Sequence, residues 1–147
     1  MAGEVRDFVA DDLLITINGQ LMTGFGPNDK VTIESANDAG IKATEGIDHE
    51  ISRSRNKSKR AKITIPLAQT SAWNDKMCGL YETDLANGAP FSISIQDLNG
   101  TTNVTATRAW IQGYPSAGFG SGADQTRSWV VETGLCASYV IGGNTAI

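Results

Sequence analysis

Hydrophobic and polar residues alternate along the first third of the chain, as they do in β-strands. Two short alternating runs, 13–18 and 20–23, are joined by Asn18-Gly19. Both central positions of a type I′ turn need a positive φ, and this residue pair tolerates it, so the sequence predicts a first β-hairpin here. Alternation in 31–35 and again in 41–44 predicts two further strands.

The segment 47–67 combines alternation with positive charge. It begins with an alternating run and ends with alternating Ile63 and Ile65, which predicts a long basic hairpin over 44–62 with a cationic tip. Half of the 12 Lys and Arg residues of a chain with a net charge of −4 lie here: Arg53, Arg55, Lys57, Lys59, Arg60 and Lys62. Since the rest of the chain is acidic, copies of the protein can attract one another.

The period of the pattern changes after residue 70. Apolar side chains then follow at helical spacing, which predicts one amphipathic helix over about 71–87 with its apolar stripe in the core: Trp73, Met77, Leu80, Tyr81 and Leu85. Thr70 or Ser71 can cap the start of this helix, Asn87-Gly88 can stop it, and Pro90 lies beyond.

Strand patterns return after the helix. They predict strands over 91–96, 104–112, 127–133 and 135–141, and in the second of these one face is expected to carry Ala106, Arg108, Trp110 and Gln112. The remaining segments are an irregular N-terminal arm (1–12), a Gly-rich loop (113–126) and a C-terminal tail (142–147). We therefore predict a single, mainly β domain over 1–147, a sandwich or partly open barrel of seven to ten strands with one helix.

The sequence predicts no catalytic residue, metal site or cofactor. His49 is the only histidine, and Cys78 and Cys136 lack zinc-ligand spacing. We expect the cysteines to be reduced, buried small hydrophobes. We expect His49 to be a paired surface residue on a strand whose other face carries Asp48 and Glu50.

Two further features are expected to have no chemical role. The glycines of GFGSG precede a β-rich run instead of a helix, which favours a connector or inter-subunit loop over a phosphate cradle. Residues 1–12 are too acidic for a signal peptide, and no run approaches the ~20 apolar residues of a membrane span. We therefore expect a protein made and kept in a cytosol, unless something larger carries it out.

The basic segment has three interpretations. It could contact nucleic acid, although it lacks interleaved aromatic residues for base stacking and the pI is near 4.9. It could be a solvated loop held open by self-repulsion. It could also dock on carboxylates of a neighbouring copy, which agrees better with the acidic remainder of the chain.

The order of segments resembles tail tube proteins of contractile-tailed bacteriophages. The matching segments are ITINGQLMTGF at 15–25, VTIESANDAG at 31–40, HEISRSRNKSKRAKITIPLAQTSAWND at 49–75, RAWIQGYPSAGFG at 108–120 and RSWVVETG at 127–134. The resemblance covers most of the chain, and it rests on patterns and not on a catalytic signature.

The resemblance implies a structural virion protein that is not an enzyme. Tail tube proteins form hexameric rings that stack into a tube inside a contractile sheath, and each subunit contributes strands to one inner β-barrel. Four strands from each of six copies, with a spacing of ~4.8 Å and a tilt near ~40°, give a barrel with a backbone diameter of roughly 48 Å. After the side chains are subtracted, this leaves a channel wider than a DNA duplex.

The implied partners are the tail sheath, baseplate and tail-terminator proteins, with genomic DNA passing through the lumen without specific binding. Assembly would occur in the host cytoplasm, the location would be the phage tail, and no membrane insertion is expected. The alternatives are the tube of a related injection system, such as a bacteriocin or secretion-system tube, and a small nucleic-acid-binding β module.

Two groups of residues are candidates for these roles. The subunit-interface candidates are Arg53, Arg55, Lys57, Lys59 and Arg60, because of their charge against an acidic remainder. The lumen candidates are Glu34 and Asp38, on strand alternation alone, since negative charge keeps passing DNA from sticking.

Overall fold

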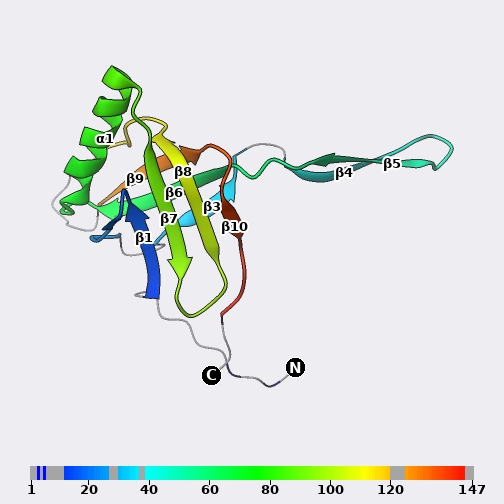
Figure 1. Cartoon of the computed structure of the whole chain (residues 1–147), viewed down its shortest axis with the longest axis horizontal. Coiled ribbons are helices and arrows are strands. Elements are labelled where there is room, and N and C mark those ends of the chain that lie inside the picture. The colour runs from blue at the N-terminus through cyan, green and yellow to red at the C-terminus, as the bar shows by residue number, and fades with distance from the viewer. Residues whose placement is uncertain are drawn as a thin grey trace.

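The computed structural model describes residues 3, 5, 12–26, 30–36, 39–119 and 125–144. Most of the predicted N-terminal arm (1–12) lies outside these residues, and so does the lumen candidate Asp38. The described chain forms ten strands and one helix (Figure 1). In order they are β1 (Leu13–Ile17), β2 (Gln20–Leu21), β3 (Thr32–Ser35), β4 (Gly40–Glu45), β5 (Ile51–Asn56), β6 (Ala61–Ala68), α1 (Trp73–Asn87), β7 (Phe91–Asp97), β8 (Asn103–Ile111), β9 (Thr126–Thr133) and β10 (Ser138–Val140).

Eight strands form one antiparallel sheet in the order β2-β1-β7-β8-β9-β6-β3, with β10 paired to β8. The segment after β2 crosses to the far end of this order. Phe25 forms a bridge with Leu67, and the Gly26 amide donates to the Pro66 carbonyl at 2.8 Å. The mainly β fold with one helix is thus confirmed, although closure of a barrel within one chain is not seen.

The first hairpin has the predicted turn. Ile17 pairs with Gln20, and the two residues between them, Asn18 and Gly19, have φ values of 51° and 80°. Two consecutive positive φ values are what a type I′ turn requires. The Asn18 side chain also accepts a hydrogen bond from the Ser92 amide at 3.1 Å, which holds the turn beside the start of β7.

The core is built from alternate residues of the long strands. β6 has a fully alternating burial pattern, and its inward-facing Ile63 and Ile65 have no exposed surface. They share one cluster with inward residues of β1, β7, β8 and β9. Each strand places every second side chain inside, so the alternation of apolar residues in the sequence has its physical cause in this core.

The alternation fails in β8, where the prediction of one continuous face was wrong. Phe91 pairs with Ala109 but Ile93 pairs with Ala106, so β8 contains one extra residue. Thr107 and Arg108 are both exposed at this bulge, and Ala109 then returns to the core. A bulge shifts the facing of every later residue, which places Ala106 inside and Trp110 on the outer face.

The helix α1 lies across one end of the curled sheet (Figure 1). Trp73 and Met77 are buried, as predicted, but Leu85 is 64% exposed because the helix extends beyond the sheet there. The helix ends at Gly88, whose φ is 63° and whose amide bonds to the Asp84 carbonyl at 2.8 Å. At the other end the Ser71 hydroxyl accepts from the Trp73 amide at 3.3 Å.

The hairpin predicted over 44–62 is displaced in the structure. The paired strands are β4 and β5, with Gly40 opposite Asn56, and β6 pairs instead with β3 and β9. Residues 46–50, expected to begin a strand, form the tip, since the His49 amide bonds to the Gly46 carbonyl at 2.9 Å. The cations therefore lie on the returning strand and at the base, and the tip is acidic.

Candidate assembly interface

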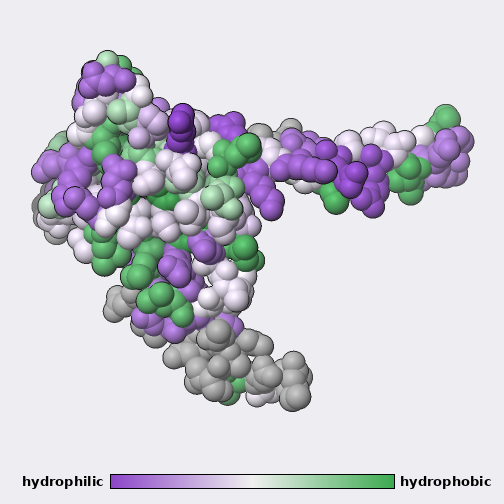
Figure 2. All heavy atoms as spheres, in the orientation of Figure 1, coloured by the Kyte–Doolittle hydropathy of each residue, from purple (hydrophilic) through white to green (hydrophobic). Residues whose placement is uncertain are grey.

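The strands β4 and β5 form a hairpin that projects away from the sheet (Figure 1). We call residues 40–56 the projecting hairpin. Every residue of both strands is exposed, and Figure 2 shows hydrophilic residues along most of its length, interrupted by hydrophobic ones. An isolated two-stranded hairpin is at best marginally stable in water, so this element gains stability when another surface covers it.

The two faces of the projecting hairpin differ in chemistry. Residues that pair directly share a face, so Ile41 with Arg55, Ala43 with Arg53, and Glu45 with Ile51 lie on one side. The other side carries only polar side chains: Lys42, Thr44, Ser52, Ser54 and Asn56. The first side therefore combines apolar and cationic groups, with Glu45 as its one acidic residue next to the tip, which suits a partner surface that is partly apolar and mainly acidic.

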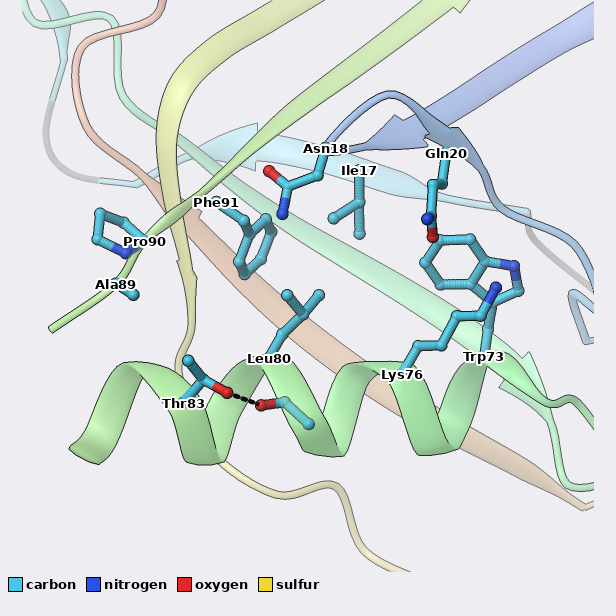
Figure 3. A pocket seen from close by; sticks show the side chains of 11 residues that line it. Ile17, Asn18, Gln20, Trp73, Lys76, Leu80, Thr83, Ala89, Pro90 and Phe91 are labelled. Atoms are coloured by element: carbon cyan, nitrogen blue, oxygen red, sulfur yellow. Dashed lines mark hydrogen bonds between the residues drawn. The ribbon is translucent and has the colours of Figure 1, made fainter. Parts of the chain in front are cut away.

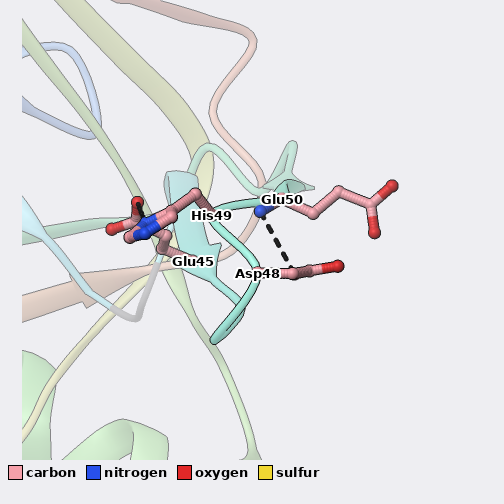
Figure 4. Close-up of polar contacts among 4 residues, drawn as sticks. All are labelled: Glu45, Asp48, His49 and Glu50. Carbon is pink, nitrogen blue, oxygen red and sulfur yellow. Dashed lines mark hydrogen bonds and ion pairs between the residues drawn. The ribbon is translucent and has the colours of Figure 1, made fainter.

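The tip carries carboxylates and one exposed isoleucine. The His49 Nδ1 atom lies 3.2 Å from the Glu45 Oε1 atom, and the Asp48 carboxylate accepts from the Glu50 amide at 3.3 Å (Figure 4). His49 is thus paired at the surface as predicted, but it lies in a turn with a φ of 67° and not on a strand. Ile47 is fully exposed.

The five interface candidates fall into separate groups. Arg53 and Arg55 lie on β5, while Lys57 and Lys59 are exposed in the connection to β6. Arg60 is half-buried: its Nε atom donates to the Thr133 carbonyl at 3.0 Å, and its guanidinium lies 5.8 Å from the centre of the Trp110 ring. Arg60 therefore fixes the base of the hairpin to the sheet.

The lumen candidate Glu34 is exposed on β3 at the end of the sheet order. Its pairing partner is Lys62, which in turn pairs with Glu132 of β9. Paired residues share a face, so Glu34 stands in a row of alternating charge and not in a purely acidic surface.

The two cysteines were expected to be buried, but Cys78 and Cys136 are free and only half-buried. Within the described residues, no group of three or more His, Cys, Asp or Glu side chains could hold a metal ion. Of the predicted Gly-rich loop, residues 113–119, 125 and 126 are described, and strand β9 begins at its last residue, Thr126. No helix in the described part of the chain is long and apolar enough to pass through a lipid bilayer.

Sequence reasoning missed the apolar side chains of the projecting hairpin. Ile41, Ile47 and Ile51 are 63%, 103% and 65% exposed. Ile41 and Ile51 lie on the face that also carries Arg53 and Arg55, and Ile47 lies at the tip. The isoleucines entered the prediction only as part of alternating strand patterns, which do not show that this strand pair lies away from the sheet.

The comparisons with known proteins agree with this geometry. The chain matches no protein-family model. It is 29% identical over 156 residues to "Structural protein ORF10" of Pseudomonas phage KPP10, covering all of this chain and 88% of that protein. Among solved structures, a chain in the six-fold-symmetric tail of an empty gene transfer agent particle superposes with a TM-score of 0.57, 14% identity and coverage of 92% and 100%.

The chain shares its fold with chains of phage-like tail and injection particles. A chain of the native gene transfer agent virion superposes with a TM-score of 0.54 at 16% identity, and the alignment covers 92% of this chain and 100% of that one. A chain of the extended sheath-tube complex of an extracellular contractile injection system gives 0.53 at 12% identity, with coverage of 95% and 93%. The shared fold thus extends over nearly the whole chain, and the predicted resemblance is confirmed for the fold.

Proposed function

We propose that this chain is a structural virion protein, the subunit of stacked hexameric rings that form the inner tube of a contractile phage tail. The tube would be the conduit for DNA ejection, and the protein would have no catalytic activity. The observation that carries the proposal is the fold, shared with a chain from a tail of six-fold symmetry and combined with a phage structural protein as sequence relative.

The edges of the sheet support ring formation. β2 and β3 end the sheet order, so each has one side without a neighbouring strand in the described chain. Unpaired strand edges invite pairing with other chains, and closing a ring of subunits removes them. The projecting hairpin offers a second contact surface for neighbouring subunits, because its apolar and basic face is uncovered in the single chain.

The proposal implies specific partners. The tube would contact the tail sheath protein and end at baseplate and terminator proteins, and genomic DNA would pass through its lumen without specific binding. The sheath is supported by the fold shared with a chain of a sheath-tube complex. The phage relative favours a phage tail over the tube of another injection system. Assembly would then occur in the host cytoplasm, and the finished protein would reside in the virion tail.

Negative-stain microscopy of the purified protein tests the proposal. At raised concentration we expect hollow tubes or short stacks of rings, with six-fold symmetry in end views and a channel wider than a DNA duplex. A dilution series of the same sample serves as its control, because rings held by weak contacts should dissociate on dilution. Separate single particles at every concentration would contradict the proposal.

A further inference from the structure

A cavity of about 480 Å³ lies between the helix α1 and the turn of the first hairpin (Figure 3). The helix supplies Trp73, Lys76, Gly79, Leu80 and Thr83 to its wall. The first hairpin faces these residues with Ile17, Asn18 and Gln20, and Phe91 lies at the start of β7.

The cavity has an apolar floor and a cationic rim. Ile17, Trp73 and Phe91 are each at least 95% buried, so the floor is firmly held by the core. Lys76 is the charged residue among those that line the cavity, and its Nζ atom lies 4.5 Å from the centre of the Trp73 ring. Such a site suits a group with one apolar side chain beside a carboxylate.

Gly79 is one of the residues that line the cavity. It lies in the middle of α1 and is exposed, and a Cβ atom added there would meet nothing within 4 Å. Glycine in a helix interior lowers helix stability relative to alanine, so this position is unfavourable for the isolated fold. A side chain at this position would occupy space that a partner could fill.

The tip of the projecting hairpin matches this site. Ile47 is fully exposed, and Asp48 and Glu50 follow it in the sequence of the tip. The projecting hairpin and α1 lie at opposite ends of the long axis of the molecule, so they cannot meet within one chain (Figure 1). A contact between two different surfaces of identical copies repeats from copy to copy and produces rings or filaments.

We infer that the cavity beside α1 receives the hairpin tip of a second copy of this chain. Ile47 fills the apolar floor, and Asp48 or Glu50 pairs with Lys76 at the rim. This inference rests on the proposed function, since it names the contact through which tube subunits hold one another. It also gives separate roles to the two parts of the projecting hairpin, the tip in the cavity and the basic face along the neighbour.

Mixed cysteine cross-linking tests the contact directly. In a background with Cys78→Ser and Cys136→Ser, one protein carries Ile47→Cys and a second carries Gly79→Cys, whose side chain has free space. Under mild oxidation at assembling concentration we expect disulfide-linked dimers in the mixture and far fewer in either protein alone. Tubes that form normally without this cross-link would overturn the inference and leave the proposed function standing. Wild-type protein that never assembles would overturn both.

A second variant needs no cysteine changes. Gly79→Leu should fill the cavity and raise the concentration required for assembly at least tenfold, while the thermal midpoint of the monomer stays equal or rises. Ala86→Leu adds the same side chain to an exposed position of the same helix outside the cavity, and should change assembly less than twofold. Unchanged assembly of Gly79→Leu would overturn the inference. A less stable Gly79→Leu monomer would also overturn the inference, because it would mean that the added side chain clashes with the chain's own residues and that the cavity is not free space.

Discussion

Ile41 and Arg55 lie directly opposite each other in the antiparallel pair of β4 and β5, so an apolar and a cationic side chain stand side by side on one face of the projecting hairpin. Arg53 continues the same face beside Ala43. The opposite face is polar throughout, with Lys42 as its cation. We propose that the face with Ile41 and Arg55 is directed at a partner and the other at solvent.

Reversing the charge of this face should abolish tube formation. In the variant with Arg53→Glu and Arg55→Glu, the contact with an acidic neighbour becomes repulsive, while the monomer stays folded because both side chains are exposed. Sedimentation and circular dichroism measure assembly and folding separately. The single variants Arg53→Glu and Lys42→Glu provide a matched comparison, since Lys42 lies on the other face of the hairpin. Lys42→Glu should impair assembly less than Arg53→Glu. Normal tubes from the double variant would contradict the role of this face.

Arg60 should behave differently from the other basic residues. Arg60→Ala removes the hydrogen bond to the Thr133 carbonyl and the contact with the Trp110 ring. We expect the monomer to lose about 1–2 kcal/mol of unfolding free energy, measured by urea denaturation. Lys59→Ala should change stability by less than about 0.5 kcal/mol, because Lys59 is exposed. Equal stability of the two variants would show that Arg60 does not anchor the hairpin.

Asn74 connects the helix to two strands. Its Nδ2 atom donates to the Ala68 carbonyl at 2.9 Å, and its Oδ1 atom accepts from the buried Trp129 indole at 3.0 Å. Asn74→Ala leaves the indole N–H without this partner, so we expect a loss of about 2–3 kcal/mol in urea denaturation. Asn87→Ala, at the exposed end of the same helix, should cost less than about 0.5 kcal/mol. Similar losses in both would rule out this connection.

Gly24 is required by a close approach of two segments. Its φ is 78°, and an added Cβ atom would lie 2.6 Å from the Ser71 Cβ atom. Gly24→Ala should therefore destabilise the fold by about 1–3 kcal/mol and lower the thermal midpoint. Gly113→Ala is the matched control, because a Cβ atom there meets nothing within 4 Å. A Gly24→Ala protein as stable as this control would mean that the two segments can separate without cost.

DNA affinity separates the tube from a nucleic-acid-binding module. A tube subunit should bind a short DNA duplex with a Kd weaker than ~100 µM at physiological salt, measured by fluorescence anisotropy. A binding module would instead show tighter, strongly salt-dependent binding that disappears when Arg53 and Arg55 are neutralised. That second result would favour the alternative function.

Local patterns predicted the parts of the fold that depend on neighbouring residues. Asn18-Gly19 identified its hairpin because few residue pairs accept two positive φ values in succession. The helix was predicted within two residues of its observed start at Trp73, since the aromatic and aliphatic spacing there is helical.

The parts that depend on distant pairing could not be predicted in the same way. The bulge at Thr107 and Arg108 arises from the register between β7 and β8, which periodicity does not contain. The prediction also paired the residues of β5 with those of β6, whereas β5 pairs with β4. The sequence does not show that β6 pairs with β3 and β9. The cavity beside α1 was missed as well, since it forms between Ile17 and Leu80, far apart in the chain.

Sedimentation velocity of the purified chain, at rising concentration and at low and high salt, tests the central claim most directly. Self-assembly into rings predicts a shift from monomers to hexamers and larger stacks as concentration increases, together with protection of the projecting hairpin from protease in the assembled fraction. A protein that sediments as a monomer under all of these conditions, with residues 40–56 cleaved at the same rate throughout, would contradict it.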